Sequence, residues 1–162
     1  MVQPGQMAPP AEEPAGDSSL VFRAGPLLCA LRLDEVIETM RPLHTHPLAG
    51  TPAFVTGICI MRGIPTLVVD VARLLGGVTA EASRFVAVRT ERGPAAFATG
   101  DILGVRAVNA DPAVHNTALL GDAPTRLIAA VGTIDAAPVL LLQSMRLVPD
   151  DVWAAAALPV PS

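Results

Sequence analysis

The sequence predicts an all-β protein made of two similar lobes, each with five strands, and one or two short helices. Three observations lead to this fold class. Short apolar segments recur along the chain, and Gly, Pro, Asp or Asn bound them, which is the pattern of a β sandwich or barrel. Tight turns join successive segments. Each half also has the same order: a hairpin, a strand that ends in a Pro-rich loop, and a second hairpin with a Leu-rich end.

The apolar segments place ten strands along the chain. They are expected at residues 19–23, 27–33, 35–41, 55–61, 64–70, 84–90, 94–99, 102–109, 127–134 and 138–142. Pro26, Pro94 and Pro138 follow the turns of three hairpins, since proline cannot donate to a central ladder. A short helix is expected at 71–75, before Gly76 and Gly77. A second one, at about 150–157, would begin on Asp150.

The domain organisation follows from a change in composition near residue 18. Residues 1–17 are rich in Pro, Ala, Gly and acidic residues, so we expect a disordered tail and no signal or transit peptide. One domain should cover 18–152, with a first lobe at about 18–80 and a second at about 81–152. In this prediction, the terminal segments of the domain can each belong to the other lobe. Residues 153–162 are expected to be a C-terminal tail.

Composition excludes several classes of function. The chain is 51% hydrophobic, but no segment reaches the ~18 apolar residues of a membrane span, so we expect a cytoplasmic protein without direct membrane insertion. The net charge is −4, all 11 basic residues are scattered arginines, and aromatic residues make up 3%, which argues against a nucleic-acid partner. Cys29 and Cys59 lie in apolar segments, which favours buried free thiols.

No catalytic motif appears in the chain. There is no nucleophile elbow and no phosphate-binding glycine loop. Asp34, Glu35 and Glu38 are close in sequence, but a solvated strand edge is the simplest interpretation of such carboxylates. Asp70 ends a run of valines and is expected to cap a turn. The sequence therefore predicts a non-enzymatic binding module with no cofactor.

One alternative rests on a His-x-His pair. The side chains of His44 and His46 would lie on one face of an extended segment, and both could reach a metal ion. With a carboxylate such as Asp70 they could serve a small metal-dependent enzyme or a metal-sensing module. The remaining histidine, His115, lies in the other half. The competing interpretation is a solvated loop.

A longer stretch carries a family resemblance. The sequence GICIMRGIPTLVVDVARLLGG, residues 57–77, preceded by Phe54-Val55-Thr56, resembles the hallmark of the CheW family of chemotaxis coupling proteins. In that family an apolar strand leads into a Leu-Arg-Gly turn and then into a second apolar strand. Further segments between Leu20 and Leu147 match the family's strands in order. The resemblance covers about residues 18 to 150.

The resemblance implies a fold and a function. The fold would be two five-stranded SH3-like barrels packed on a shared core. The function would be that of an adaptor, or scaffold, in chemotaxis-type two-component signal transduction. It would join the cytoplasmic hairpin of a chemoreceptor, a methyl-accepting chemotaxis protein, to the regulatory domain of a CheA-type histidine kinase. Other CheW-like proteins would be further partners, and the adaptor would be recruited to membrane-associated receptor arrays.

The resemblance also carries site residues over by position. Those that match family positions for receptor contact or coupling are Arg62, Gly63, Val36, Glu38 and Gly57. The Arg62-Gly63 pair is the most diagnostic. The chain departs from the family beside it, because Ile60 and Met61 stand where the family commonly has Asn and Leu, and Pro65 comes early. These departures bear on the choice of partner rather than on the fold.

Overall fold

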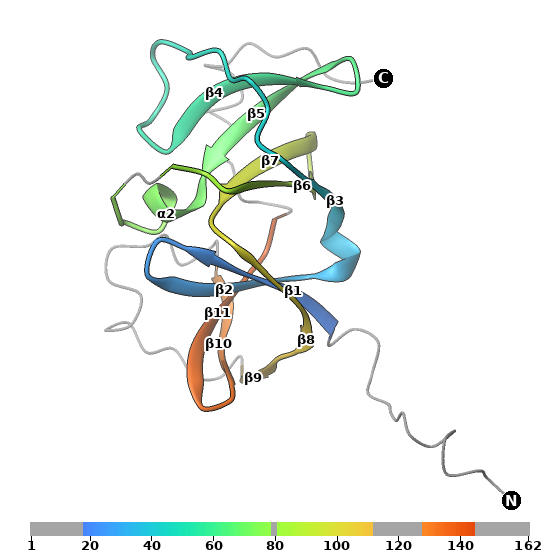
Figure 1. The fold of residues 1–162 in the computed structure, drawn as a ribbon, viewed down its shortest axis with the longest axis vertical. Helices are drawn as coiled ribbons and strands as arrows, with labels where there is room; N and C mark the ends of the chain where they lie inside the picture. The colour runs from blue at the N-terminus through green and yellow to red at the C-terminus, as the bar shows by residue number, and fades with distance from the viewer. Residues whose placement is uncertain (1–17, 79–80, 112–127, 145–162) are drawn as a thin grey trace, which may run out of the picture.

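The computed structural model describes residues 18–78, 81–111 and 128–144, and these form two β sheets, one above the other in Figure 1. The strands in the described residues are β1 Ser18–Ala24, β2 Leu27–Arg32, β3 Val36–Met40, β4 Val55–Met61, β5 Ile64–Asp70, β6 Arg84–Thr90, β7 Gly93–Thr99, β8 Ile102–Ala107, β9 Asn109–Asp111, β10 Ile128–Ile134 and β11 Ala137–Leu142. A 3-10 turn, η2, covers Leu33–Glu35, and a single helix turn, α2, covers Val71–Leu74.

The expected strands and the first helix agree with these elements, with two differences. The segment predicted as one strand at 102–109 is split into β8 and β9 at Val108, which is buried in a cluster with Val21 and Ile134. The strand predicted from residue 35 begins only at Val36, because η2 precedes it. The second helix at 150–157, His115 and the tails 1–17 and 153–162 lie outside the described residues.

The second sheet is closed on itself. Its strand order is β8-β1-β2-β11-β10-β9, so β8 and β9 lie at opposite edges. In the chain, however, only Val108 separates them. A chain can pass from one edge to the other within one residue only if the two edges meet, so this sheet curls into a barrel.

The first sheet has the order β3-β6-β7-β5-β4, so its edges are β3 and β4. The chain that leaves β3 returns to the β4 edge, where His46 and Ile58 exchange two backbone hydrogen bonds of 2.8 and 2.9 Å. We call this region the seam: Glu38 of β3, residues 43–48, and β4 with its following turn at Arg62 and Gly63. The seam is where the first barrel closes.

The two sheets do not divide the chain at the expected boundary near residue 80. The hairpin β1–β2 belongs to the second sheet, where β2 pairs in parallel with β11. The hairpin β6–β7 belongs to the first sheet, where β7 pairs in parallel with β5. Each barrel therefore contains strands from both halves, and the predicted lobes 18–80 and 81–152 are not the structural units.

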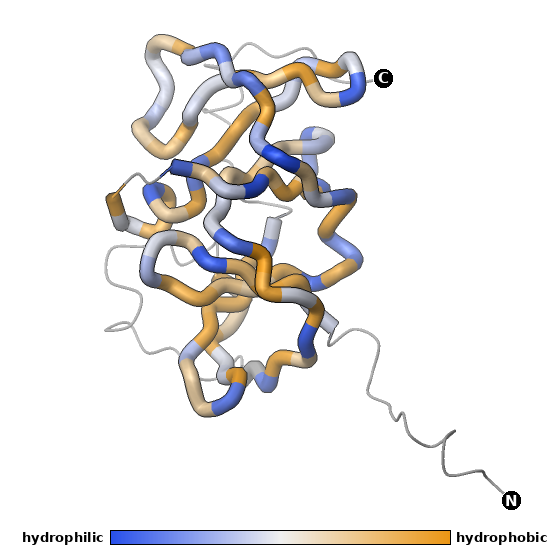
Figure 2. The backbone as a smooth tube through the Cα atoms, in the orientation of Figure 1, coloured by the Kyte–Doolittle hydropathy of each residue, from blue (hydrophilic) through white to orange (hydrophobic). Residues whose placement is uncertain are grey.

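The core has three parts. The largest cluster lies between the sheets and includes Phe22 and Leu31 of the second sheet with Leu67 and Phe97 of the first, all fully buried. Two smaller clusters are each confined to one sheet. Cys59 and Phe85 belong to the one in the first barrel, and Val21 and Val139 to the one in the second. In Figure 2 hydrophobic residues recur along the strands of both sheets, while hydrophilic residues lie at the turns.

Candidate functional site

Four of the five site residues predicted from the resemblance, Glu38, Gly57, Arg62 and Gly63, lie at the seam. Arg62 lies in the two-residue turn between β4 and β5, and Glu38 lies on β3 at the opposite edge of the same sheet. The Arg62 guanidinium donates two hydrogen bonds to the Glu38 carboxylate, from Nε to Oε2 at 2.6 Å and from Nη2 to Oε1 at 2.7 Å. This forked ion pair spans the two edges where the barrel closes.

The backbone of the turn explains why an arginine here is unusual. Arg62 has φ 52° and Gly63 has φ 79°, the pattern of a type I′ hairpin turn. Asn or Asp followed by Gly is preferred in such turns, because side chains with a Cβ are strained at positive φ. An arginine in this conformation costs free energy. The ion pair with Glu38 offsets part of that cost and holds the guanidinium in place.

The ion pair shifts the titration of both groups. The hydrogen bond from Arg62 holds the pKa of the Glu38 carboxyl below its ordinary value, and Glu38 raises the pKa of Arg62. The pair's contribution to stability is therefore complete above the pKa that Glu38 has in the unfolded chain. It is lost as the pH falls through the lower pKa of the folded state.

Replacing Arg62 by Ala is expected to raise the pKa of Glu38 toward its ordinary value, because the donor that stabilises the carboxylate is gone. A carbon-detected NMR titration of the Glu38 side chain measures this directly. In the control variant Arg32→Ala, which removes an arginine paired with Asp34 at 3.5 Å, the Glu38 titration should match the wild type. An unchanged Glu38 titration would show that the pair is not formed in solution.

Gly57 and Gly63 have different roles. Gly57 has φ 151°, and a Cβ built on it would overlap the carbonyl oxygen of His46, so the returning chain at the seam requires glycine there. At Gly63 the turn requires positive φ, but no atom lies within 4 Å of a Cβ built there. Gly57 therefore supports closure of the barrel, whereas Gly63 supports only the turn.

Val36 lies apart from the exposed part of the seam. It is partly buried and packs against the cluster between the sheets. The exposed isoleucines next to the ion-pair residues in the chain are instead Ile37, before Glu38, and Ile60 and Ile64, on either side of the turn, with Ile60 55% exposed. The outward position of Ile60 on β4 could be predicted, because it alternates with Gly57, Cys59 and Met61, which face the buried side of the strand.

The three-residue metal site proposed as an alternative is not formed. The rings of His44 and His46 are adjacent, but Asp70 does not join them, and within the described residues no three His, Cys, Asp or Glu side chains are close enough to hold a metal ion. Asp70 is instead the N-cap of α2 and accepts a hydrogen bond from the backbone N–H of Arg73 at 3.2 Å. Its predicted capping role is confirmed.

The neighbouring carboxylates were predicted to lie on a solvated strand edge, but one of them, Glu35, makes specific hydrogen bonds. Glu35 accepts hydrogen bonds from the backbone N–H and the hydroxyl of Ser144, at 2.6 and 2.9 Å, and Ser144 is fully buried. Asp34 is exposed. Glu35 thus ties the link between β2 and β3 to the end of β11, because η2 turns it away from its position in an extended strand.

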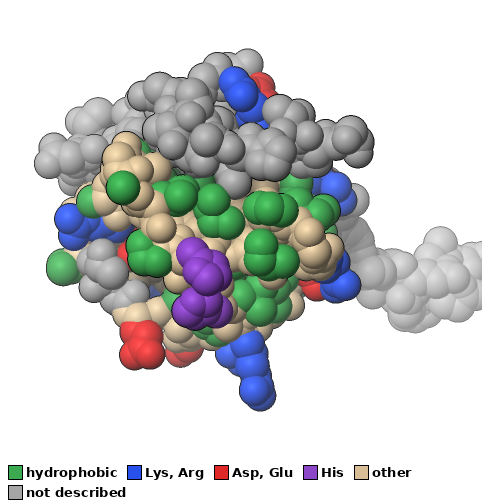
Figure 3. All heavy atoms as spheres, turned by 90° about the horizontal axis from the view of Figure 1, so that it is seen from above, with side chains coloured by type: hydrophobic (Ala, Val, Ile, Leu, Met, Phe, Trp, Pro, Cys, Tyr) green, Lys and Arg blue, Asp and Glu red, His purple; other side chains and the backbone are tan. Residues whose placement is uncertain are grey.

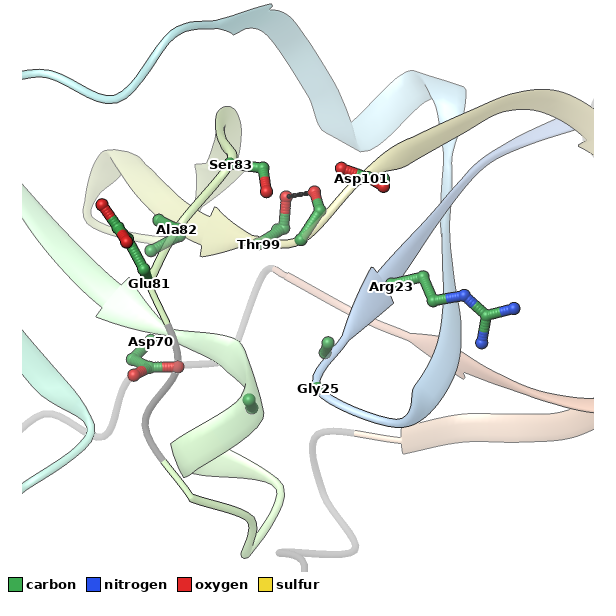
Figure 4. A pocket seen from close by; sticks show the side chains of 12 residues that line it. Arg23, Gly25, Asp70, Glu81, Ala82, Ser83, Thr99 and Asp101 are labelled. Atoms are coloured by element: carbon green, nitrogen blue, oxygen red, sulfur yellow. Dashed lines mark hydrogen bonds between the residues drawn. The ribbon is translucent and has the colours of Figure 1, made fainter.

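An open hollow of about 260 Å³ lies where the two sheets meet (Figure 4). The residues that line it include Asp70, Glu81, Thr99 and Asp101, and the side chain of Arg23 points away from the carboxylates. Thr99 Oγ1 donates to the carbonyl of Gly100 at 2.9 Å. Nothing in this hollow pairs an acid with a base, so it offers no catalytic arrangement.

The two cysteines are buried free thiols, as predicted. Cys29 lies in the cluster between the sheets and Cys59 in the cluster of the first barrel. Burial raises the pKa of the Cys29 thiol to about 12 and also raises that of Cys59. A thiol that stays protonated is neither a nucleophile nor a metal ligand.

No helix in the described part of the chain has the length and apolar character that crossing a bilayer requires. The comparison with curated proteins found no match. Among solved structures, the chain is similar to the scaffolding protein TtCheW from Thermoanaerobacter tengcongensis, with a TM-score of 0.70 and 18% sequence identity. The alignment covers 85% of this chain and 95% of that one. This likeness confirms the predicted fold of two SH3-like barrels; in this chain one of the sheets has a sixth, three-residue strand.

The model of the CheW-like domain family matches residues 18–152, which is most of the chain. The match agrees with the family resemblance found in the sequence. The chain therefore belongs to the family of CheW-like domains, the non-enzymatic scaffolding proteins of chemotaxis signalling.

Proposed function

We propose that this protein couples the cytoplasmic hairpin of a chemoreceptor to the regulatory domain of a CheA-type histidine kinase, in the cytoplasm and at membrane-associated receptor arrays. The observation that carries the proposal is the exposed, oriented guanidinium at the seam. The Arg62 side chain is 75% exposed although it makes a forked ion pair with Glu38. A charged group that is both fixed and exposed suits recognition of a partner.

The remaining donors of Arg62 define the receptor-facing surface. A guanidinium has five N–H donors, and Glu38 accepts two of them, so three remain for an acceptor on the partner. Ile60, 55% exposed and two residues before Arg62 in the chain, adds apolar area close to the turn. An amphipathic helical hairpin, with apolar positions and carboxylates or carbonyls beside them, has the matching chemistry. Gly57 and Gly63 shape this surface, and Val36 supports it from the core.

A second surface belongs to the kinase in this proposal. In the second sheet, the large apolar side chains that are exposed among the described residues are Leu103 and Val105, at 49% and 53%. Both lie on β8, two residues apart. Since the kinase regulatory domain of this family is itself CheW-like, an apolar contact between barrels at this strand would build larger assemblies. Other CheW-like proteins could dock in the same way.

Binding measurements with two partners test the proposal. Immobilised wild-type protein should bind both a receptor cytoplasmic hairpin and the regulatory domain of a CheA-type kinase encoded by the same genome. Arg62→Ala should weaken receptor binding at least about tenfold, as expected for a central arginine anchor, and leave kinase binding and the thermal melt nearly unchanged. A double substitution, Leu103→Ser with Val105→Ser, should have the opposite selectivity.

Arg32→Ala is the matched control, because Arg32 is also an exposed arginine paired with a carboxylate, at 3.5 Å from Asp34. It lies outside the seam and should leave both affinities unchanged. If the wild-type protein binds neither partner, the proposed coupling is wrong. If Arg32→Ala and Arg62→Ala weaken receptor binding equally, the seam is not the receptor-facing surface.

A further inference from the structure

The histidine pair lies on the seam in a fixed stretch of backbone. Pro42 and Pro47 flank the segment and restrict its backbone angles, and the two hydrogen bonds between His46 and Ile58 hold it against the edge of β4. Both histidines are exposed, and their ring centroids lie 4.5 Å apart with an interplanar angle of 86°. Figure 3 shows the two histidine side chains, in purple, side by side on the surface.

This spacing matches two imidazoles that share one metal ion. With metal–nitrogen bonds of about 2.0 to 2.1 Å, a metal ion lies roughly 3.2 Å from the centre of each ring. If the nitrogen–metal–nitrogen angle is about 90°, the two ring centroids lie about 4.5 Å apart. A tetrahedral nitrogen–metal–nitrogen angle would place the centroids about 5.2 Å apart. The rings meet edge to face. The terminal torsion of a histidine is soft, so each ring can rotate about it to direct a nitrogen at a shared ion.

We propose that His44 and His46 form a two-ligand surface site for a late transition metal ion, with Cu²⁺ bound most tightly. A nitrogen–metal–nitrogen angle of about 90° is typical of the square-planar or tetragonal coordination that Cu²⁺ and Ni²⁺ adopt, and imidazole is a suitable ligand for both ions. Affinity follows the order in which Cu²⁺ exceeds Ni²⁺ and Zn²⁺. Water completes the coordination. The site needs neither Asp70 nor any other protein ligand, and the proposal does not rest on the proposed coupling function, although the site lies on the seam.

Titration of the full, untagged chain with CuCl₂, followed by calorimetry and by electron paramagnetic resonance, tests the site. We expect one tightly bound Cu²⁺ per chain, with two nitrogen ligands in the equatorial plane of the spectrum. Acid should displace the ion, because only neutral imidazole binds a metal. His44→Ala and His46→Ala should each weaken binding at least about tenfold, since loss of a mere outer-shell partner already costs about 10- to 100-fold.

His115→Ala is the matched control, because it removes the third of the chain's three histidines. It should retain the tight site. Thermal melts of the His44→Ala and His46→Ala variants should match the wild type, since both seam histidines are exposed and their side chains are not part of the core. Absence of tight binding, binding that survives His44→Ala, or one ion held between two chains would each overturn the proposal.

Discussion

Replacing Phe97 by Ala is expected to lower the free energy of unfolding by about 3 to 5 kcal/mol. Phe97 lies on β7 and is fully buried in the cluster between the two sheets, with Phe22 and Leu67 in the same cluster. Its removal would leave a cavity bounded by both barrels, which the rigid sheets cannot collapse to fill. Urea unfolding followed by circular dichroism measures the change, and the slope of the transition should stay the same.

Ile60→Ala is the control for this prediction. Ile60 is 55% exposed on β4, so its truncation should change the free energy of unfolding by only about 0.5 kcal/mol. Because the large cluster joins both sheets, the wild type should unfold in one transition. Two separate transitions in the Phe97→Ala protein, only one of them shifted, would mean that the barrels do not share a cooperative core.

Replacing Gly57 by Ala is expected to lower the free energy of unfolding by about 2 to 4 kcal/mol, through two effects that add. The backbone at φ 151° disfavours any side chain, and the new Cβ would overlap the carbonyl oxygen of His46. Relief of the overlap requires the returning chain to move off β4, which breaks the paired hydrogen bonds between His46 and Ile58. A thermal melt measures the loss, and hydrogen exchange at Ile58 should report the opened seam.

Gly63→Ala separates the two effects. Gly63 has φ 79° but open space around the position of a Cβ, so only the backbone strain remains, at about 1 to 2 kcal/mol. We therefore expect the Gly57 variant to be the less stable of the two. Equal losses of stability in the two variants would show that the contact with His46 does not affect stability and that the seam adapts to a side chain at residue 57.

The local structure could be predicted from the sequence because its causes are local. In strand β4, Gly57, Cys59 and Met61 face inward. Thr56, Ile58 and Ile60 face outward, and this alternation can be read directly from the sequence. The turn at Arg62 and Gly63 and the cap at Asp70 also depend on neighbours within a few residues. The prediction of one strand at 102–109 was wrong, because the bend at Val108 arises from a barrel that closes around it.

The proposed receptor-facing surface could be predicted only in part. The family resemblance singled out Arg62, Glu38 and Gly57, and the structure brings them together at one seam. Nothing in the spacing of Arg62 and Glu38, which are 24 residues apart, indicates that they form a forked ion pair. The partly buried position of Val36 was also not evident, because an apolar residue at a strand start can face either side.

By itself, the sequence determined the class of this protein: an all-β, non-catalytic domain whose strands and turns are encoded by alternation, glycine and proline. The tertiary structure alone decided which strands share a barrel, since the parallel pairs β2 with β11 and β5 with β7 join segments far apart in the chain. It also decided that the first barrel closes at the seam. Contacts of this kind depend on how the two edges of a curled sheet approach each other in space, and no local sequence pattern encodes that approach.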